Sequence, residues 1–100
     1  MQWTTTMTPE KRVKDAIKKY LTGIGAWYYM PVPNGFAGRS IDFFVCFQGK
    51  FYGIEAKAED VSKATKRQED TLNDIATAGG GVCVENRTDC YNVKTMLGML

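Results

Sequence analysis

Two apolar runs separated by a short polar gap constrain the fold of this chain more than any other feature. The runs occupy residues 41–47 and 51–58, and Gln48, Gly49 and Lys50 lie between them. Both runs are enriched in aromatic and β-branched residues, as buried strands are, and a gap this short joins antiparallel neighbours. The segment therefore predicts a β-hairpin that belongs to the core.

Three charged residues lie at the open end of this hairpin. Asp42 begins the first run, and Glu55 and Lys57 come near the end of the second. Side chains alternate between the two faces of a strand. If the first two residues of the gap form a two-residue turn, Asp42 lies opposite Glu55; if the last two form it, Asp42 lies opposite Lys57. All three charges share a face in either register, whereas a three-residue turn would place Asp42 opposite Ala56.

The carboxylates of Asp42 and Glu55 would repel each other at the roughly 5 Å that separates opposed side chains, and burial strengthens such repulsion. A cation usually holds a pair of this kind. Mg²⁺ prefers oxygen ligands and often takes one or two carboxylates together with substrate phosphates. A nearby lysine could position a water or stabilise charge on a phosphate. The spacing fits a metal site and an ion-pair cluster at a strand edge equally well.

The composition excludes several other kinds of site. Histidine is absent, which excludes Ser-His and Cys-His catalysis and the commonest zinc sites. The nucleotide-binding patterns GxGxxG and GxxxxGK do not occur. The chain has no CxxC pair, and we expect reduced, mostly buried thiols at Cys46, Cys83 and Cys90. Any chemistry must therefore come from carboxylates, lysines and the backbone.

The length and charge of the chain fit one domain over residues 1–100. The hydrophobic content is 44% and the charged content is 24%, both ordinary for a globular protein, and the net charge of +2 says little about partners. The N-terminal stretch "MQWTTTMTPEKR" has no apolar run typical of a signal peptide, and no later segment reaches a membrane-spanning length. We therefore expect a cytoplasmic protein, in a bacterial or phage-infected cell, without membrane association.

A helix and a strand are predicted before the hairpin. Thr8 suits an N-cap and Pro9 the first helical position, and apolar residues then recur at helical spacing up to Gly23. Most lysines of this helix fall outside its apolar stripe. Residues 26–32, "AWYYMPV", are short, aromatic and followed by proline, which predicts a strand near a sheet edge.

Two helices and a strand are predicted after the hairpin. Thr65 and Gln68 have the spacing of a capping box. Residues 81–85, "GVCVE", fit a short buried strand, and Asp89 suits the N-cap of a closing helix. The order helix, three strands, helix, strand, helix predicts an α/β domain with one mixed sheet and helices packed against it.

An aspartate followed by Glu-x-Lys across a hairpin resembles the PD-(D/E)xK nuclease superfamily, and the order of elements resembles its restriction-endonuclease-like core. Within that superfamily the chain is most similar to the VRR-NUC (virus-type replication-repair nuclease) domain. This resemblance covers residues 8–85 and rests on Glu10, "GFAGRSID" ending at Asp42, "GIEAK", and Gln68 before "AGGG". One position departs, because Ile41 stands where the family usually has proline.

The resemblance implies Mg²⁺- or Mn²⁺-dependent endonucleolytic hydrolysis of DNA, especially of junctions and flaps in replication, recombination or repair. It also implies a homodimer and a replication or repair protein as a partner. The implied metal ligands are Asp42, Glu55, the Ala56 carbonyl and Glu10. The implied catalytic residues are Asp42, Glu55, Lys57, Glu10 and Gln68.

The supporting residues also have purely structural interpretations. A glutamate such as Glu10 is favoured in a first helical turn by the helix dipole, although its spacing also points it toward the sheet. Gln68 can close the capping box, while Leu72 and Ile75 place it on the buried face of its helix. Solvated basic residues near the site are candidates for DNA phosphate contacts: Arg39, Lys50, Lys63, Lys66 and Arg67.

Two other functions remain open. A non-catalytic nucleic-acid-binding module would use the flanking lysines without cutting, and its binding would be sensitive to salt. A homodimeric scaffold would keep the charge cluster for structure alone. We expect the aromatic residues 27–29 in the core or in an interface.

Overall fold

The described part of the chain, residues 7–32 and 41–100 of this computed structural model, contains three helices and four strands. In chain order they are α1 (Pro9–Gly23), β1 (Trp27–Tyr29), β2 (Phe43–Phe47), β3 (Lys50–Ala56), α2 (Lys66–Thr77), β4 (Gly81–Glu85) and α3 (Tyr91–Met96). The predicted order of elements is confirmed.

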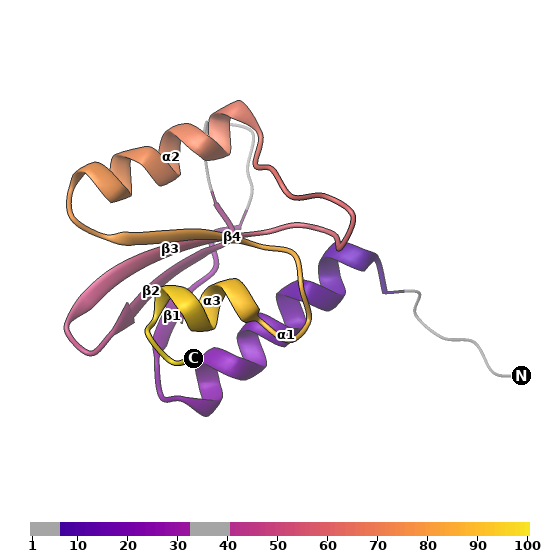
Figure 1. The fold of residues 1–100 in the computed structure, drawn as a ribbon, viewed down its shortest axis with the longest axis horizontal. Helices are drawn as coiled ribbons and strands as arrows, with labels where there is room; N and C mark the ends of the chain where they lie inside the picture. The colour runs from indigo at the N-terminus through magenta and orange to yellow at the C-terminus, as the bar shows by residue number, and fades with distance from the viewer. Residues whose placement is uncertain (1–6, 33–40) are drawn as a thin grey trace, which may run out of the picture.

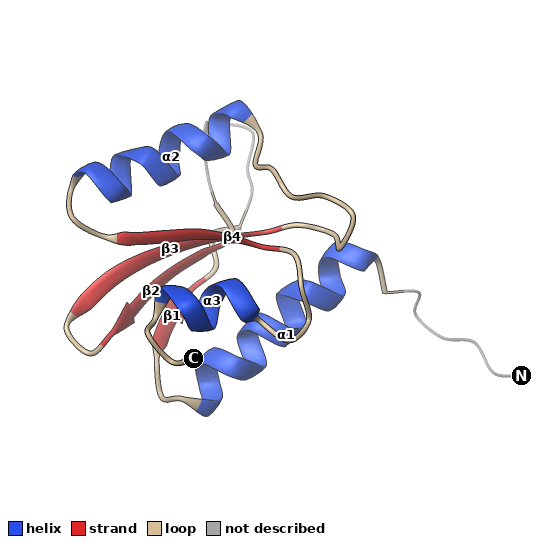
Figure 2. Cartoon of the chain, in the orientation of Figure 1, coloured by secondary structure: helices blue, strands red, loops and turns tan. Residues whose placement is uncertain are grey.

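The strands form one mixed sheet in the order β1-β2-β3-β4. The first two pairs are antiparallel and the β3–β4 pair is parallel, because α2 carries the chain back between them. Helix α2 covers one face of the sheet, and α1 and α3 cover the other (Figures 1 and 2). The predicted α/β architecture, with β1 at an edge, is confirmed. Among the described residues, no helix is long and apolar enough to cross a membrane.

The turn between β2 and β3 selects the first of the two predicted registers. Phe47 pairs with Lys50, and Phe43 pairs with Ile54. Gln48 and Gly49 have φ angles of 51° and 80°, which is the pattern of a type I′ hairpin turn. Continuing the register by one residue places Asp42 opposite Glu55.

The main core lies on the face that α1 and α3 cover. Thr8 caps α1 by accepting a hydrogen bond from the Lys11 amide at 3.2 Å, as predicted. The apolar stripe of the helix then packs on the inward side chains of the hairpin. The buried core residues of these elements are Val13, Ile17, Leu21, Phe43, Val45, Phe47, Tyr52, Ile54, Ala56 and Val93.

The charged residues at the open end of the hairpin point to the second face of the sheet, and α2 packs on that face. The predicted capping box is present, with the Thr65 amide donating to Gln68 Oε1 at 2.9 Å. A Cβ atom at Gly53 would lie 2.6 Å from Ile75 Cδ1 and 2.7 Å from Ile41 Cδ1. The glycine two residues before Glu55 therefore lets the helix approach the sheet beside the charges.

The C-terminal part differs from the prediction in two ways. β4 is an edge strand and only half-buried, apart from Glu85. The N-cap of α3 is Cys90, with φ at 55°, rather than Asp89. The buried Glu85 carboxylate accepts a hydrogen bond from the Val93 amide at 2.8 Å, while the Asp89 carboxylate accepts one from the Tyr91 amide at 3.1 Å. A side chain from the sheet thus supplies part of the cap, which local sequence does not reveal.

The cysteines and aromatic residues divide between core and surface. All three cysteines are free, as expected. The expectation that they are mostly buried is wrong, because Cys46 is exposed and Cys83 is only half-buried. Burial raises the pKa of Cys83 to about 12. Tyr28 packs on Phe43 with ring centroids 5.8 Å apart, whereas Trp27 is 62% exposed. Tyr29 is also exposed, so only the middle aromatic of the triplet packs against the core.

We predict that the hairpin turn responds oppositely to two substitutions. Gly49→Val should lower the free energy of unfolding by about 1–2 kcal/mol, because its φ of 80° disfavours a β-branched residue although no atom lies within 4 Å. Gln48→Asn should be neutral or raise it by about 0.5 kcal/mol, because asparagine tolerates positive φ. Urea unfolding measures both. Equal effects of the two would contradict the type I′ turn.

Candidate functional site

The predicted meeting of Asp42, Glu55 and Lys57 takes place at the end of β3, where the hairpin opens. The Asp42 amide donates to Glu55 Oε1 at 3.1 Å, and the Ala56 amide donates to Asp42 Oδ2 at 3.0 Å. Each carboxylate is therefore held by the backbone of the neighbouring segment. This reciprocal arrangement follows from the register, because it sets the two acids directly across from each other.

Two lysines approach the carboxylates from different sides. Lys57 Nζ lies 3.6 Å from Glu55 Oε2, slightly beyond hydrogen-bonding distance. Lys14 Nζ lies 3.3 Å from Asp42 Oδ1 and 3.3 Å from Glu10 Oε2. Glu10 therefore joins the cluster through Lys14, a residue that no sequence motif marks as part of the site. Its spacing of four residues from Glu10 was the available signal, because such pairs are neighbours on a helix.

The site is closed at the Glu55 end and open at the Glu10 end. Glu55 is 1% exposed. The side chains of Lys57, Asp42 and Lys14 are 13%, 19% and 31% exposed, and that of Glu10 is 43% exposed. A ligand would therefore reach the carboxylates from the side where α1 begins.

Burial disfavours the charged form of Glu55, and Lys57 only partly offsets this effect. Burial, together with the negative charge of Asp42, raises the pKa of Glu55 to about 8, against the opposing effect of Lys57. At Lys14, burial works against the ammonium, but Asp42 and Glu10 outweigh it and raise its pKa. The two acids thus form a site that additional positive charge would stabilise.

The carboxylates fit a divalent ion that needs few protein ligands. In residues 7–32 and 41–100, no group of three or more Asp, Glu, Cys or His side chains is arranged to hold a metal. A closed cage of protein ligands is therefore not formed there. Mg²⁺ or Mn²⁺ held by Asp42 and Glu55, with waters and substrate phosphates as further ligands, matches the donors present. The role of the Ala56 carbonyl stays a prediction, since the contact observed at Asp42 uses the Ala56 amide.

Gln68 occupies its structural role. Its side-chain oxygen accepts from the Thr65 amide, and its own amide donates to Thr65 Oγ1 at 3.3 Å. The residue is half-buried at the start of α2. Its predicted second role, as support for the active site, stays a prediction.

The candidate DNA-binding residues within residues 7–32 and 41–100 do not gather in one place. Lys63, Lys66 and Arg67 are exposed in and after the loop that leads from β3 to α2, and Lys66 pairs with Asp70 at 2.6 Å. Lys50 lies beside the hairpin turn, about 17 Å along β3 from Glu55 at roughly 3.3 Å per residue. The expectation that Lys50 flanks the charge cluster therefore fails, because the two-residue turn puts it at the far end of the strand. Arg39, the fifth candidate, lies outside the described residues.

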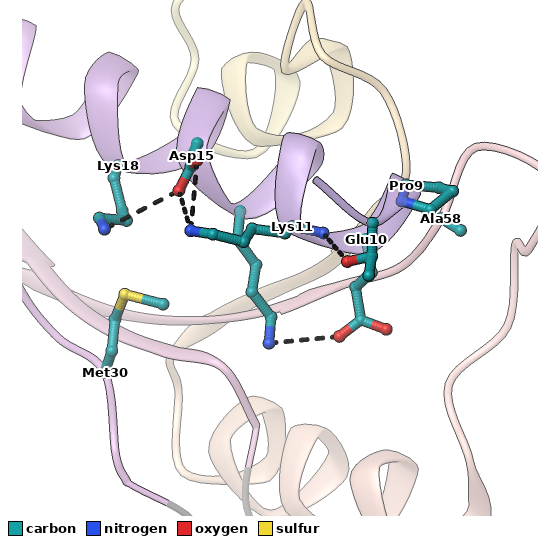
Figure 3. Close-up of a pocket in the computed structure, with 9 residues that line it drawn as sticks. Pro9, Glu10, Lys11, Asp15, Lys18, Met30 and Ala58 are labelled. Carbon is teal, nitrogen blue, oxygen red and sulfur yellow. Dashed lines mark hydrogen bonds and ion pairs between the residues drawn. The ribbon is translucent and has the colours of Figure 1, made fainter. Parts of the chain in front are cut away.

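An open groove of about 640 Å³ runs along α1 beside the charge cluster (Figure 3). One wall is the helix, with Glu10 and Lys14 at the end nearest Asp42. Met30 and Ala58 contribute to the lining from outside the helix. The open side of the site therefore continues into a groove that runs along α1.

Comparisons with known protein families, characterised proteins and solved structures return no match to this chain. The resemblance to VRR-NUC domains stays a prediction. The case for a function therefore rests on the geometry of the charge cluster.

We predict that Glu55 makes the stability of the fold depend on pH. The folded chain keeps the Glu55 proton up to about pH 8, whereas an ordinary glutamate releases it near 4.5. Stability should therefore fall as pH rises from 4.5 to 8, by at most about 1.4 kcal/mol per unit. Glu55→Gln should remove this dependence and be more stable than the wild type above pH 8. Urea unfolding from pH 5 to 9 measures it.

The matched control is Glu59→Gln, which removes an exposed carboxylate from the loop after β3. It should leave the pH profile of the wild type unchanged. A Glu55→Gln protein with the same pH profile as the wild type would show that Glu55 is ionised in the fold at ordinary pH.

Proposed function

We propose that this chain is a metal-dependent DNA endonuclease of the PD-(D/E)xK type, with a restriction-endonuclease-like fold. The observation that carries the proposal is the placement of Asp42, Glu55 and Lys57 together at the open end of the β2–β3 hairpin. The mixed sheet and the order of its elements support it. Branched or flapped DNA is the proposed substrate, and a homodimer and a repair partner stay predictions.

Asp42 and Glu55 would hold a Mg²⁺ or Mn²⁺ ion at this site. Such an ion, when bound, polarises a phosphate and lowers the pKa of a water bound to it. The Ala56 amide fixes the Asp42 carboxylate, and the Asp42 amide fixes that of Glu55, so both are oriented before a ligand arrives. Glu55 must give up the proton that burial favours before its carboxylate can bind a cation.

Lys57 has the geometry of a residue that stabilises negative charge. Its ammonium lies near Glu55 Oε2 without a close hydrogen bond, and its side chain is 13% exposed. A largely buried ammonium interacts strongly with charge that develops nearby, because little water screens it. We assign Lys57 to the phosphate that is hydrolysed.

We predict that cleavage depends on Glu55 and Lys57. Labelled junction, flap and linear DNA are incubated with Mg²⁺ or Mn²⁺, and products are resolved on denaturing gels. Glu55→Gln and Lys57→Met should each lower the rate by about 100-fold or more, because each removes a group aimed at the reacting phosphate or its cation. Glu59→Gln is the matched control and should cut like the wild type.

The outcomes separate the candidate functions. Cleavage that is unchanged in both site variants would show that Glu55 and Lys57 do not form the active site. Salt-sensitive DNA binding without products at any metal concentration would favour a non-catalytic nucleic-acid-binding module. Neither binding nor cleavage would leave the charge cluster as a structural feature of a scaffold.

A further inference from the structure

Lys14 connects two acids that belong to different parts of the fold. Its Nζ atom lies 3.3 Å from Glu10 Oε2, one turn earlier on α1. It also lies 3.3 Å from Oδ1 of Asp42, the residue that immediately precedes β2 in the chain. Strong ion pairs between ammonium and carboxylate are shorter, at roughly 2.7–2.9 Å. The side chain is 31% exposed. Lys14 therefore divides its contacts between two acids and stays partly accessible to solvent.

The charges around Asp42 disfavour Lys14 and a divalent ion at the same carboxylate. Three acids carry up to three negative charges, and Lys14 and Lys57 carry two positive charges. A divalent ion added to this set would leave an excess of positive charge. The ammonium of Lys14 lies at Asp42 Oδ1, an oxygen that the ion would use, so the two cations would repel each other at short range. Lys14 is the lysine that can leave, because its side chain is 31% exposed and borders the groove, whereas that of Lys57 is 13% exposed.

The groove along α1 offers a place for the displaced ammonium. Lys14 lines this groove, and so do Lys11 and Lys18, about one turn before and one turn after it on α1. Figure 3 shows Lys11 and Lys18 on the helix that forms the wall. Lys11 and Lys18 share the carboxylate of Asp15, at 3.3 Å and 3.9 Å. Their side chains are 54% and 45% exposed, and exposed pairs of this kind are weak. A phosphate in the groove would meet basic side chains that can exchange partners.

We propose that Lys14 is an exchangeable cation of the site. Without a divalent ion, its ammonium neutralises Asp42 and Glu10. When Asp42 holds a divalent ion, the ammonium turns into the groove on α1 and binds a phosphate of the DNA strand that leads to the site. The inference rests on the proposed function and adds to it the path of the strand.

The first test measures Mn²⁺ binding to the DNA-free protein by calorimetry. Lys14→Gln should bind Mn²⁺ about threefold to tenfold more tightly than the wild type, because the competing cation is gone. Lys11→Gln makes the same change in net charge one turn away and should stay within about twofold of the wild type. Equal or weaker binding by Lys14→Gln would overturn the inference.

The second test measures binding of labelled flap DNA by fluorescence anisotropy, in EDTA and in Ca²⁺, an ion that usually supports binding without cleavage. Ca²⁺ should strengthen DNA binding by the wild type more than by Lys14→Gln. In Ca²⁺, the slope of log K against log salt should be shallower by about 1 in the variant, the change expected for one lost phosphate contact. Identical slopes would remove the phosphate contact from the inference.

Two further variants separate failure of this inference from failure of the proposed function. Asp42→Asn and Glu55→Gln should each weaken Mn²⁺ binding, with far-ultraviolet circular dichroism as a check on folding. If they do not, the metal site is wrong and the inference on Lys14 falls with it. If they weaken binding while Lys14→Gln fails to strengthen it, the metal site stands and only the role of Lys14 is overturned.

Discussion

Asp42 and Glu55 face each other across the open end of the β2–β3 hairpin, each bound by a backbone amide of the opposite segment. Neither bond would form if the hairpin shifted by one residue, because Asp42 would then point to the other face relative to Glu55. The type I′ turn at Gln48 and Gly49 holds that register from the far end of the hairpin. The site thus depends on a turn that lies a whole strand length away.

The position of Glu55 works against folding, and the rest of the sheet offsets it. A carboxyl group that is 1% exposed and next to another acid is a costly element of a core. The opposite face of the same strands packs apolar side chains against α1 and α3. Gly53 brings α2 close on the side of the charges. The buried acid is therefore tolerated because the surrounding structure is well packed.

Much of the fold follows from local signals in the sequence. The apolar runs, the Thr8 cap and the Thr65–Gln68 capping box determine where strands and helices begin, because these signals act over a few residues. Strand alternation alone puts Asp42 and Glu55 on one face for either two-residue turn. The order of elements, and the mixed sheet that it implies, needs no more information than this.

The tertiary structure decides contacts between elements that are distant in the chain. The turn at Gln48 and Gly49 settles the register and, with it, the place of Lys50 far from the cluster. The packing of the helices brings Lys14 of α1 to Asp42 and lets Glu85 complete the cap of α3. These outcomes depend on how α1 and α3 lie against the sheet, which no pattern of a few residues encodes. The sequence by itself therefore determined which acids share a face. Only the packing of α1 on the sheet decided that Lys14 joins Lys57 at these acids, since ion pairs between elements require their atoms to be within about 4 Å.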